Sequence, residues 1–460
     1  MIDWEQMITA EQKAQIAKDQ AAIPLPWLAK LKNIDPRDKA FGMLVSASAG
    51  DAAQNGAAMD LALQAVLADN LPLYIPPGKT YLNAAEINTE INESDFRVYG
   101  EGAASLLTVL DNAPLFTVDG RADERYRHEL HDFSVDFLAA TFDQTRLYQV
   151  KADDTVYGGL RASKFYNITS RGPQKVFDFE PTALIAFGGL LQTPGYAFLQ
   201  FTSLQIPQYT RYPNRVIHFH SGHGAHTMVT NSQLRADPTA GISFESGDGE
   251  SLIGDFIFAG NHVVLGDYGI KLNGPTNRSK YSSNNQIVGN QFDVMTTGIG
   301  WLANIDNPIL DNAGLYGTAQ DWRLDNCLNV DIRDIGAAQG RHGVLGKTLG
   351  NGTHTIWTIS RSEATRTKAT IRIAVDFSVE APSLNARHVY RNAILTCNSG
   401  TWTVQNITGP IGNDLADLTL ALTPSGDSVL VQAIIANAAG AGKLTGQATL
   451  VGDNRKVAYN

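Results

Sequence analysis

Short stretches of alternating apolar and polar residues dominate the chain between residues 40 and 340. Each stretch is four to six residues long and is bounded by Gly, Asn, Asp or Ser. This is the pattern of half-buried β-strands separated by turns. Helical periodicity in this region is confined to Ala57 to Ala68. The region is therefore predicted to be an all-β body that begins with one helix.

Five of these stretches align without gaps, with apolar residues at their second and fourth positions. They are residues 176–180, 216–220, 241–245, 269–273 and 298–302. Their successive separations are 40, 25, 28 and 29 residues, and a further apolar stretch follows each of the first four. A propeller blade needs about 40 residues or more, whereas a β-helix coil holds short strands in fewer. The repeat predicts a parallel β-helix, in which stacked coils share one core.

The two ends of the chain differ from this body. Ala10 to Ala22 is rich in good helix formers and is followed by Pro24, so a short N-terminal helix is predicted. Beyond residue 340, six candidate strands alternate with turns such as the one at Ser425 and Gly426, which favours a β-sandwich. The predicted organisation is a helical segment (1–38), a parallel β-helix (39–340) and a C-terminal β-sandwich domain (341–460).

The alignment also predicts which side chains point outward, because successive side chains of a strand alternate between its two faces. Phe179, Phe219, Phe244 and Leu272 are predicted to form an inward column, with Trp301 on the same inward set. Two outward ladders follow from the same alignment, with a residue from each of the five stretches. They are Asp178, His218, Ser243, Lys271, Gly300 and Glu180, His220, Glu245, Asn273, Leu302.

These ladders contain the densest group of titratable residues in the chain. Glu180 and Glu245 would lie two coils apart, roughly 9–10 Å by strand spacing, near the carboxyl separation of inverting glycosidases. Asp178 and Glu245 form a diagonal alternative, and His220 would lie between the glutamates. We therefore take Glu180, Glu245 and Asp178 as candidate catalytic residues. The alternative is that these charges are only solvated, as on many outward sheet faces.

Further residues are candidates for substrate binding. A long loop before the second aligned stretch mixes tyrosine with arginine, a combination that suits sugar rings and acidic sugars, although it could also serve only to rigidify the loop. An acidic turn follows the third stretch. The predicted substrate-binding residues are His218, His220, Lys271, Asn273, Tyr209, Arg211, Tyr212, Arg215 and Asp248.

Composition excludes several classes of protein. A net charge of −10 argues against a general nucleic-acid binder, and no apolar run of about 20 residues spans a membrane. Cys327 and Cys397 are too few for a cysteine-based zinc site or a disulfide framework. The histidines at 218, 220, 223 and 226 have no metal-motif spacing, so neither a metal nor a cofactor is predicted. The start of the chain has no signal-peptide pattern, which predicts folding in a cytoplasm.

Three consecutive features resemble the entry of the pectin lyase-like right-handed β-helix superfamily. They are the helix at 57–68, the stretch LYIPPGKTY at 73–81 and the stretch FRVYGEG at 96–102. With the predicted helical lead and terminal β-domain, the chain resembles a bacteriophage tailspike or a capsule or O-antigen depolymerase. The resemblance implies a homotrimer in a virion tail, attached to other tail or baseplate proteins through its N-terminus. It also implies a bacterial surface polysaccharide as the ligand.

Three functions remain open from the sequence. A glycoside hydrolase would use the three carboxylates named above, and the excess of acids over bases in the ladders favours it. A polysaccharide lyase would need a base such as His220 and cations such as Lys271 or Arg215 to neutralise a uronate. A receptor-binding fibre without catalysis would use the same face only to hold sugar.

Overall fold

The computed structural model describes most of the chain from residue 33 onward. The described residues are 33–38, 41–44, 48–121, 123–155, 157–181, 185–187, 191–193, 195–223, 226–276, 284–313, 320–325, 327, 331–332, 347–360, 368–381, 384–413, 415–436, 442–452 and 456–459. The predicted N-terminal helix lies outside them, and the two predicted domain boundaries stay predictions.

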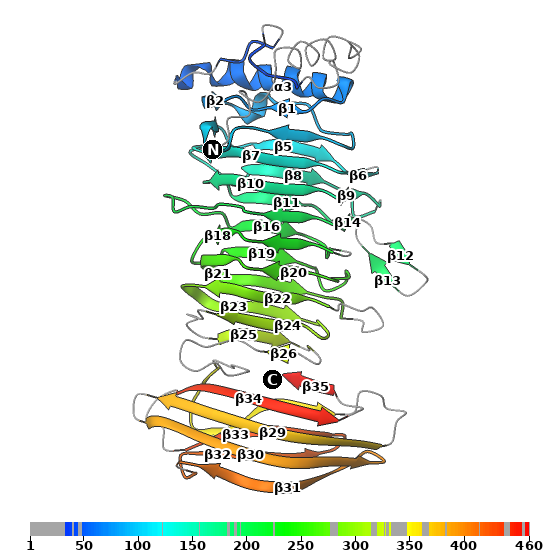
Figure 1. Ribbon diagram of the computed structural model, residues 1–460, viewed down its shortest axis with the longest axis vertical. Helices are drawn as coiled ribbons and strands as arrows, with labels where there is room; N and C mark the ends of the chain where they lie inside the picture. Colours follow the sequence, from blue (N-terminus) through cyan, green and yellow to red (C-terminus); the bar gives the residue numbers. More distant parts are fainter. Residues whose placement is uncertain are drawn as a thin grey trace, which may run out of the picture.

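The body is a parallel β-helix, which confirms the predicted fold class (Figure 1). One long face, here called sheet 1, stacks one strand from each coil in parallel register. Its strands are β5 (Pro114–Asp119), β8 (Arg146–Lys151), β11 (Lys175–Phe179), β16 (Arg215–Phe219), β19 (Ile242–Ser246), the second half of β21 (His262–Asn273), β23 (Met295–Ala303) and β25 (Gln320–Asp325).

A second parallel sheet, here called sheet 2, closes the other side of the coils. Its strands are β1 (Leu73–Tyr74), β2 (Gly78–Leu82), β3 (Arg97–Tyr99), β4 (Ser105–Val109), β7 (Glu129–Phe137), β10 (Lys164–Arg171), β15 (Gln200–Thr202), β17 (Met228–Thr230), β18 (Gln233–Arg235), β20 (Ile257–Ala259), the first half of β21, β22 (Gln286–Phe292), β24 (Ile309–Ala313) and β26 (Asp331–Ile332). A short parallel sheet joins the two early in the solenoid and consists of β6 (Glu124–Tyr126), β9 (Gly159–Arg161) and β14 (Tyr196–Ala197).

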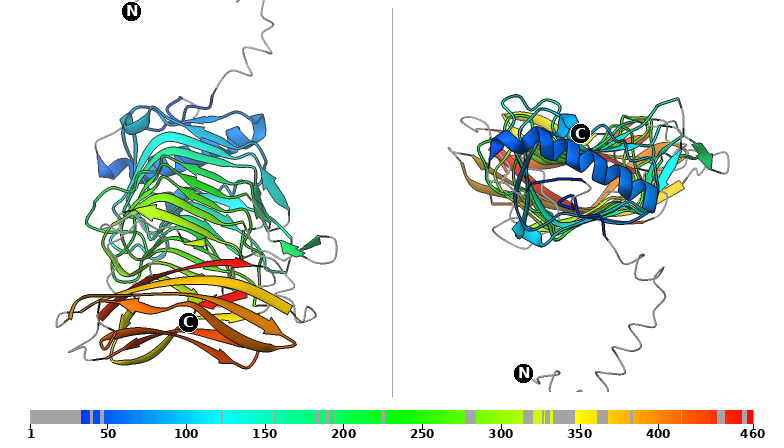
Figure 2. Two further views of the ribbon diagram at one scale, coloured as in Figure 1. Left: turned by 60° about the horizontal axis from the view of Figure 1, so that its bottom comes forward. Right: turned by 90° about the horizontal axis from the view of Figure 1, so that it is seen from above.

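Helix α3 (Ala52–Asp69) covers one open end of the solenoid (Figure 2). It includes the predicted helix and starts five residues earlier. Met59, Leu63 and Val66 are buried in the shared core, which gives the first coil an apolar lid. The buried Asn55 fixes the lid in place, since its side-chain amide donates to the carbonyl of Tyr81 at 2.7 Å. Short 3-10 turns flank the helix or the first coils at Ala49–Asp51, Ala84–Glu86 and Gly102–Ala104.

Stacked aromatic rings fill the middle of the solenoid. Phe179 and Phe219 are fully buried and lie parallel at 4.5 Å between ring centroids, with Phe244 5.8 Å from Phe219. Leu272 is also fully buried. The predicted inward column of Phe179, Phe219, Phe244 and Leu272 is thus confirmed as core, and continuous stacking is what joins the coils into one cooperative body.

A ladder of buried asparagines holds the turns of the later coils. The side-chain amide of Asn261 donates to Oδ1 of Asn290 at 3.0 Å, and Asn290 repeats this with Asn312 at 2.8 Å. Each asparagine also binds backbone, as in the 2.7 Å bond from Asn290 to the carbonyl of Phe258. Turn polar groups that would otherwise be buried unpaired are satisfied in this way.

Two antiparallel sheets form the C-terminal β-sandwich around a core of their own, as predicted. One holds β27 (Lys347–Leu349), β34 (Gly442–Gly452), β29 (Lys368–Ala381), β30 (Leu384–Asn398) and β31 (Thr401–Gly412); the other holds β32 (Leu418–Ser425), β33 (Ser428–Ile435), β28 (Gly352–Ser360) and β35 (Lys456–Tyr459). Trp357 and Trp402 belong to this core. Among the residues that the structure describes, no helix is both long and apolar enough to span a bilayer.

Candidate functional site

A row of polar side chains crosses the outer face of sheet 1 at one level. The strand pairing places Asp178 beside His218, then Glu245, Lys271 and Trp301 on successive coils. We call these five residues the charged ladder. Adjacent members are about 4.8 Å apart at the backbone, so each side chain can contact both neighbours.

The register corrects two details of the sequence alignment. Glu245, not Ser243, lies level with His218, and Trp301, not Gly300, lies level with Lys271. A shift of two residues keeps every side chain on the same face, so the apolar pattern could not reveal the first error. The second is a shift of one residue, which moves Trp301 from the predicted core to the outer face.

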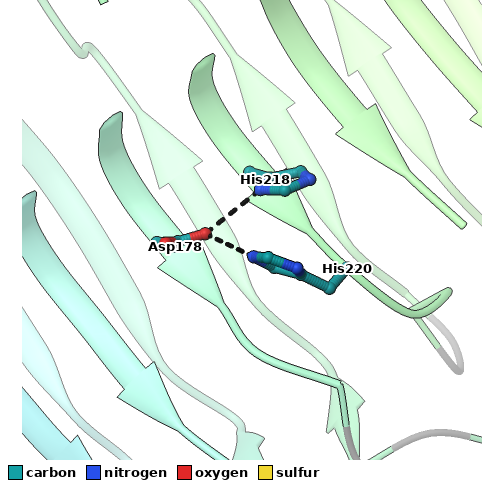
Figure 3. A group of neighbouring side chains, drawn as sticks. All are labelled: Asp178, His218 and His220. Atoms are coloured by element: carbon teal, nitrogen blue, oxygen red, sulfur yellow. Dashed lines mark hydrogen bonds and ion pairs between the residues drawn. The ribbon is translucent and has the colours of Figure 1, made fainter. Parts of the chain in front are cut away.

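Asp178 is the centre of the ladder's hydrogen bonding (Figure 3). Its Oδ1 accepts from Nδ1 of His218 at 3.1 Å and from Nε2 of His220 at 2.9 Å. Arg146 Nε donates to Oδ2 at 2.9 Å, and Lys175 Nζ contacts both carboxylate oxygens at 2.9 and 3.0 Å. Only 3% of the Asp178 side chain is exposed. The carboxylate is therefore fully used inside the protein.

These contacts fix the protonation of the buried groups. Burial alone would raise the pKa of Asp178, but the hydrogen bonds from His218 and His220 and the charge of Lys175 hold that pKa far below its usual range. Burial lowers the pKa of His218 to about 4 and also lowers the pKa of Lys175. At neutral pH, Asp178 is an anion and His218 is an uncharged imidazole.

Asp178, His218 and His220 also have the donor set of a metal site, since their ligand atoms all lie within 4.8 Å of one another. The Lys175 ammonium contacts all three groups, at 2.9 Å from Asp178, 3.0 Å from His218 and 3.3 Å from His220. It thus occupies the position that a metal ion would need. Because an ammonium and a divalent cation repel each other, this geometry favours a site that works without metal.

Glu245 is held by two cations on the next part of the ladder. Arg215 Nε donates to its Oε2, and Lys271 Nζ donates to Oε1 at 2.6 Å. Burial alone would raise the pKa of Glu245, but Arg215 and Lys271 outweigh it and the pKa is lowered. Lys271 Nζ also lies 4.8 Å above the ring centroid of Trp301, which leaves an aromatic ring and a cation together on a partly exposed face.

Glu180 lies apart from this group. It follows the end of β11, and its carboxylate accepts from the Gln149 amide at 2.7 Å and from the backbone N–H of Ala152 at 3.3 Å. It is two coils from Glu245 and two residues out of level, which puts their Cα atoms about 12 Å apart. The carboxylates that lie level, two coils apart, are instead Asp178 and Glu245.

The predicted loop and turn residues have mixed positions. Arg211 donates to the carbonyls of Ala139 and Ala140, so it ties its loop to the body rather than reaching the ladder. The half-buried ring of Tyr209 packs beside Gly172. Tyr212 is half-buried as well, Asn273 lies against the turn at Gly249, and Asp248 caps that turn by accepting from the N–H groups of Glu250 and Ser251. Of the residues predicted in the loop, only Arg215 contacts the charged ladder, through its bond to Glu245.

Sequence reasoning missed Arg146 and Lys175, which carry the two cations against Asp178. Both occupy the first position of a strand in sheet 1 and align with Arg215. That recurrence of basic residues at strand starts was a readable signal, but the aligned stretches began one residue later.

No protein-family model matches the sequence, and no curated protein sequence matches it either. The tailspike protein of Acinetobacter phage vB_ApiP_P1 is 14% identical with a TM-score of 0.40, over 93% of this chain and 88% of that one. The tailspike gp49 of Acinetobacter baumannii bacteriophage Fri1, a capsular polysaccharide depolymerase, is 8% identical with a TM-score of 0.29, over 87% and 84%. Pantoea stewartii WceF, a glycan biofilm modifying enzyme with a tailspike-like parallel β-helix fold, is 8% identical with a TM-score of 0.24, over 90% and 63%.

Two of these structures are phage tailspikes, and the third has a tailspike-like fold. With TM-scores below 0.5, the likeness assigns no activity and no residue role to this chain.

Proposed function

We propose that this chain is a bacteriophage tailspike that binds a bacterial surface polysaccharide and depolymerises it on the outer face of sheet 1. The observation that carries the proposal is the charged ladder, where two carboxylates, a histidine, a lysine and an aromatic ring lie in register on one face, with His220, Arg146, Lys175 and Arg215 bound to the two carboxylates. The acids of a merely solvated surface are exposed to water, whereas Asp178 and Glu245 are buried and paired with cations, as is common at functional sites.

The net charge of the ladder carboxylates and the cations that bind them favours an acidic polymer. With histidine counted as neutral, the cations Arg146, Lys175, Arg215 and Lys271 exceed Asp178 and Glu245 by two charges. The chain as a whole carries −10. A local excess of positive charge on an acidic protein attracts anionic groups to that face.

His220 is the group best placed to remove a proton from substrate. An ionised carboxylate can only accept hydrogen bonds, so the ring nitrogen that faces Asp178, Nε2, carries the imidazole hydrogen. The lone pair is then on Nδ1. The His220 side chain is 35% exposed, against 16% for His218. Of the two histidines that bind Asp178, His220 is therefore the one that a polymer reaches more easily.

This arrangement supports cleavage of a uronate-containing polysaccharide by β-elimination. His220 removes the proton from the carbon next to the uronate carboxylate, and the electron pair forms a carbon–carbon double bond as the glycosidic bond breaks. The departing oxygen then takes a proton back from the His220 imidazolium, directly or through water. Lys271 and Arg215 stabilise the negative charge that develops on the carboxylate. Asp178 keeps His220 oriented and does not touch the substrate.

Hydrolysis is the second candidate, and one residue favours it. Inverting hydrolysis needs a carboxylic acid that is protonated at the working pH, and the lowered pKa values of Asp178 and Glu245 disfavour that role for them. Glu180 is a partly buried carboxylate beside the same edge of sheet 1, and the Gln149 amide and the Ala152 N–H that bind it are both uncharged. A hydrolase would therefore depend on Glu180 rather than on the aligned pair.

The test is incubation of the chain with a panel of purified acidic capsular polysaccharides. New chain ends together with the ultraviolet absorbance of an unsaturated uronate support elimination. New chain ends without that absorbance support hydrolysis, and then Glu180→Gln should abolish them. Binding without new ends would overturn the enzymatic part of the proposal and leave a receptor-binding fibre.

The remaining parts of the proposal concern assembly. A homotrimer in the virion tail, attached through the N-terminal segment to other tail or baseplate proteins, follows from the resemblance to tailspikes. Sedimentation under native conditions tests it, because a species near 49.7 kDa, the mass of one chain, would contradict the trimer.

A further inference from the structure

One corner of the solenoid repeats a left-handed backbone conformation in coil after coil. Two residues before seven strands of sheet 2, a single residue has a φ between 49° and 60°. These residues are Arg127, Ala162, Phe198, His226, Asp255, Asn284 and Asn307. Asn and Asp tolerate this conformation, whereas for a bulky residue it is a real outlier that costs about 1–3 kcal/mol. Histidine is also enriched in this conformation, so Arg127 and Phe198 are the costly members of the row, and Arg127 forms an ion pair with Asp95.

Phe198 and His226, the aromatic members of the row, are also exposed. Phe198 is 49% exposed and is the one phenylalanine in the described part of the chain that reaches this level. Its ring stacks on His226 at 4.9 Å between centroids with an interplanar angle of 29°. The His226 side chain is itself 54% exposed.

Hydrogen-bonding groups continue the row on the next two coils. Nε2 of His226 lies 3.8 Å from Oδ2 of Asp255, and the side-chain amide of Asn284 donates to Oδ1 of Asp255 at 3.1 Å. The row from Phe198 to Asn284 covers three coil steps, about 14 Å. It presents an aromatic surface followed by carboxylate and amide groups, which together match the apolar face and the hydroxyls of pyranose sugars.

The corner lies next to the proposed cleavage site along the chain. Glu180 and Phe198 are the two ends of the segment that contains a hairpin formed by β12 (Ile185–Phe187) and β13 (Leu191–Thr193), which projects from the body (Figures 1 and 2). The chain also reaches His226 six residues after His220. A polymer bound at the charged ladder would have to continue past this region or past the opposite edge of sheet 1.

We propose that Phe198, His226, Asp255 and Asn284 form an auxiliary sugar-binding strip for the polysaccharide. A pyranose ring stacks on Phe198, and the hydroxyls of the following sugars bind Asp255 and Asn284. The strip takes no part in bond cleavage. It binds the polymer at sugars that lie some distance from the linkage being cleaved. This proposal rests on the proposed function, since it assumes that the chain acts on a polysaccharide.

The test uses Phe198→Gly, which removes the ring and relieves the backbone strain at the same position. The matched control is Ala162→Gly, at the same corner one coil earlier. The probe is a purified capsular polysaccharide that the wild-type chain cleaves, together with short oligosaccharides made from it. We expect Phe198→Gly to raise the polymer Kd and KM about tenfold, the loss of one stacked ring. The kcat, and the kinetics on short oligosaccharides, should not change.

Phe198→Trp should bind the polymer within about threefold of wild type, because a larger ring can still stack. Ala162→Gly should match wild type throughout. Wild-type polymer binding by Phe198→Gly, with the parent chain active, would overturn the strip alone. An inactive parent that binds no polysaccharide at all would overturn the proposed function as well.

Discussion

The solenoid carries two outward ladders with the same geometry and opposite chemistry. On sheet 2, Tyr74, Tyr99, His131 and Tyr166 follow one another in register. His131 stacks on Tyr166 at 4.5 Å with an interplanar angle of 6°, and on Tyr99 at 5.9 Å. On sheet 1, the charged ladder occupies the corresponding outer face.

The ladder of Tyr74, Tyr99, His131 and Tyr166, here called the ring ladder, finds its stacking and hydrogen-bond partners within the protein, whereas the charged ladder leaves groups open to a ligand. The Tyr166 hydroxyl donates to Glu129 at 2.9 Å, and the Tyr99 hydroxyl accepts from Asn33 at 2.6 Å. Stacked rings cover each other's faces and expose only their edges. The charged ladder and the side chains bound to it instead combine buried ion pairs with the partly exposed His220 and an excess of cations. The comparison teaches that parallel stacking alone gives a structural ladder, and that function requires groups whose bonding is incomplete without a ligand.

The largest expected effect is on catalysis. His220→Ala should lower polysaccharide cleavage by about 10²–10⁴-fold, because a positioned base is lost. The fold should be unchanged, since the ring is partly exposed and Asp178 keeps its other partners. A reducing-end assay measures the rate. His131→Ala, on the ring ladder, is the control and should cleave normally; equal activity of the two variants would remove the functional difference between the ladders.

The next effect is on stability. Asp178→Asn should lower the free energy of unfolding by about 3–5 kcal/mol, because Arg146 and Lys175 would remain largely buried without their counter-ion. Urea unfolding followed by circular dichroism measures the change. A loss below about 1 kcal/mol would mean that these charges are already well hydrated, and the buried ion-pair description would be wrong.

Acid should act on the buried histidines of the interior and on His218 of the charged ladder, because burial lowers the pKa of each of them. Burial lowers the pKa of His128 to about 4 and that of His223 to about 3, whereas both titrate near 6.5 when unfolded. Between pH 6.5 and 4 the unfolded chain binds protons that the folded chain does not, so stability falls as pH falls. His128 alone contributes about 3 kcal/mol to this loss.

Urea midpoints at pH 7 and pH 4.5 measure this acid effect. His128→Gln should be less stable at pH 7 but should show a shallower pH dependence than the parent. Equal stability of the parent at the two pH values would contradict the assignment of these histidines as buried and uncharged.

A smaller effect should come from the ring ladder. Tyr166→Phe keeps the stack and removes the hydroxyl bond to Glu129, so the expected cost is about 1 kcal/mol, with cleavage unchanged. Differential scanning calorimetry and the reducing-end assay together check it. A large loss of activity would show that sheet 2 also contacts the substrate.

The smallest expected effect is that of chelation. EDTA should leave cleavage unchanged, because Lys175 occupies the centre of the Asp178–His218–His220 group. Lys175→Ala should instead bind one Zn²⁺ per chain in isothermal titration calorimetry. Loss of wild-type activity on chelation, restored by added metal, would contradict this description.

The fold was predictable because the repeat of its coils appears in the sequence as a repeat of apolar positions. Phe179, Phe219, Phe244 and Leu272 could be assigned to the core from their spacing, since each coil repeats one strand of sheet 1. The exact register could not be predicted, because Ser243 and Glu245 lie on the same face and differ only by a slide of two residues. The pairing of Asp178 with Arg146 and Lys175 was hidden for another reason: it depends on contacts between coils and not on any local motif.

The central claim is that polysaccharide binds and is cleaved over the charged ladder. The most direct test is a crystal structure of His220→Ala soaked with an oligosaccharide from the polysaccharide that the wild-type chain cleaves. We predict a sugar over residue 220, with an acidic group at Lys271 and Arg215 and a ring near Trp301. An oligosaccharide bound elsewhere, for example in a groove between subunits, with this face of sheet 1 empty would contradict the account.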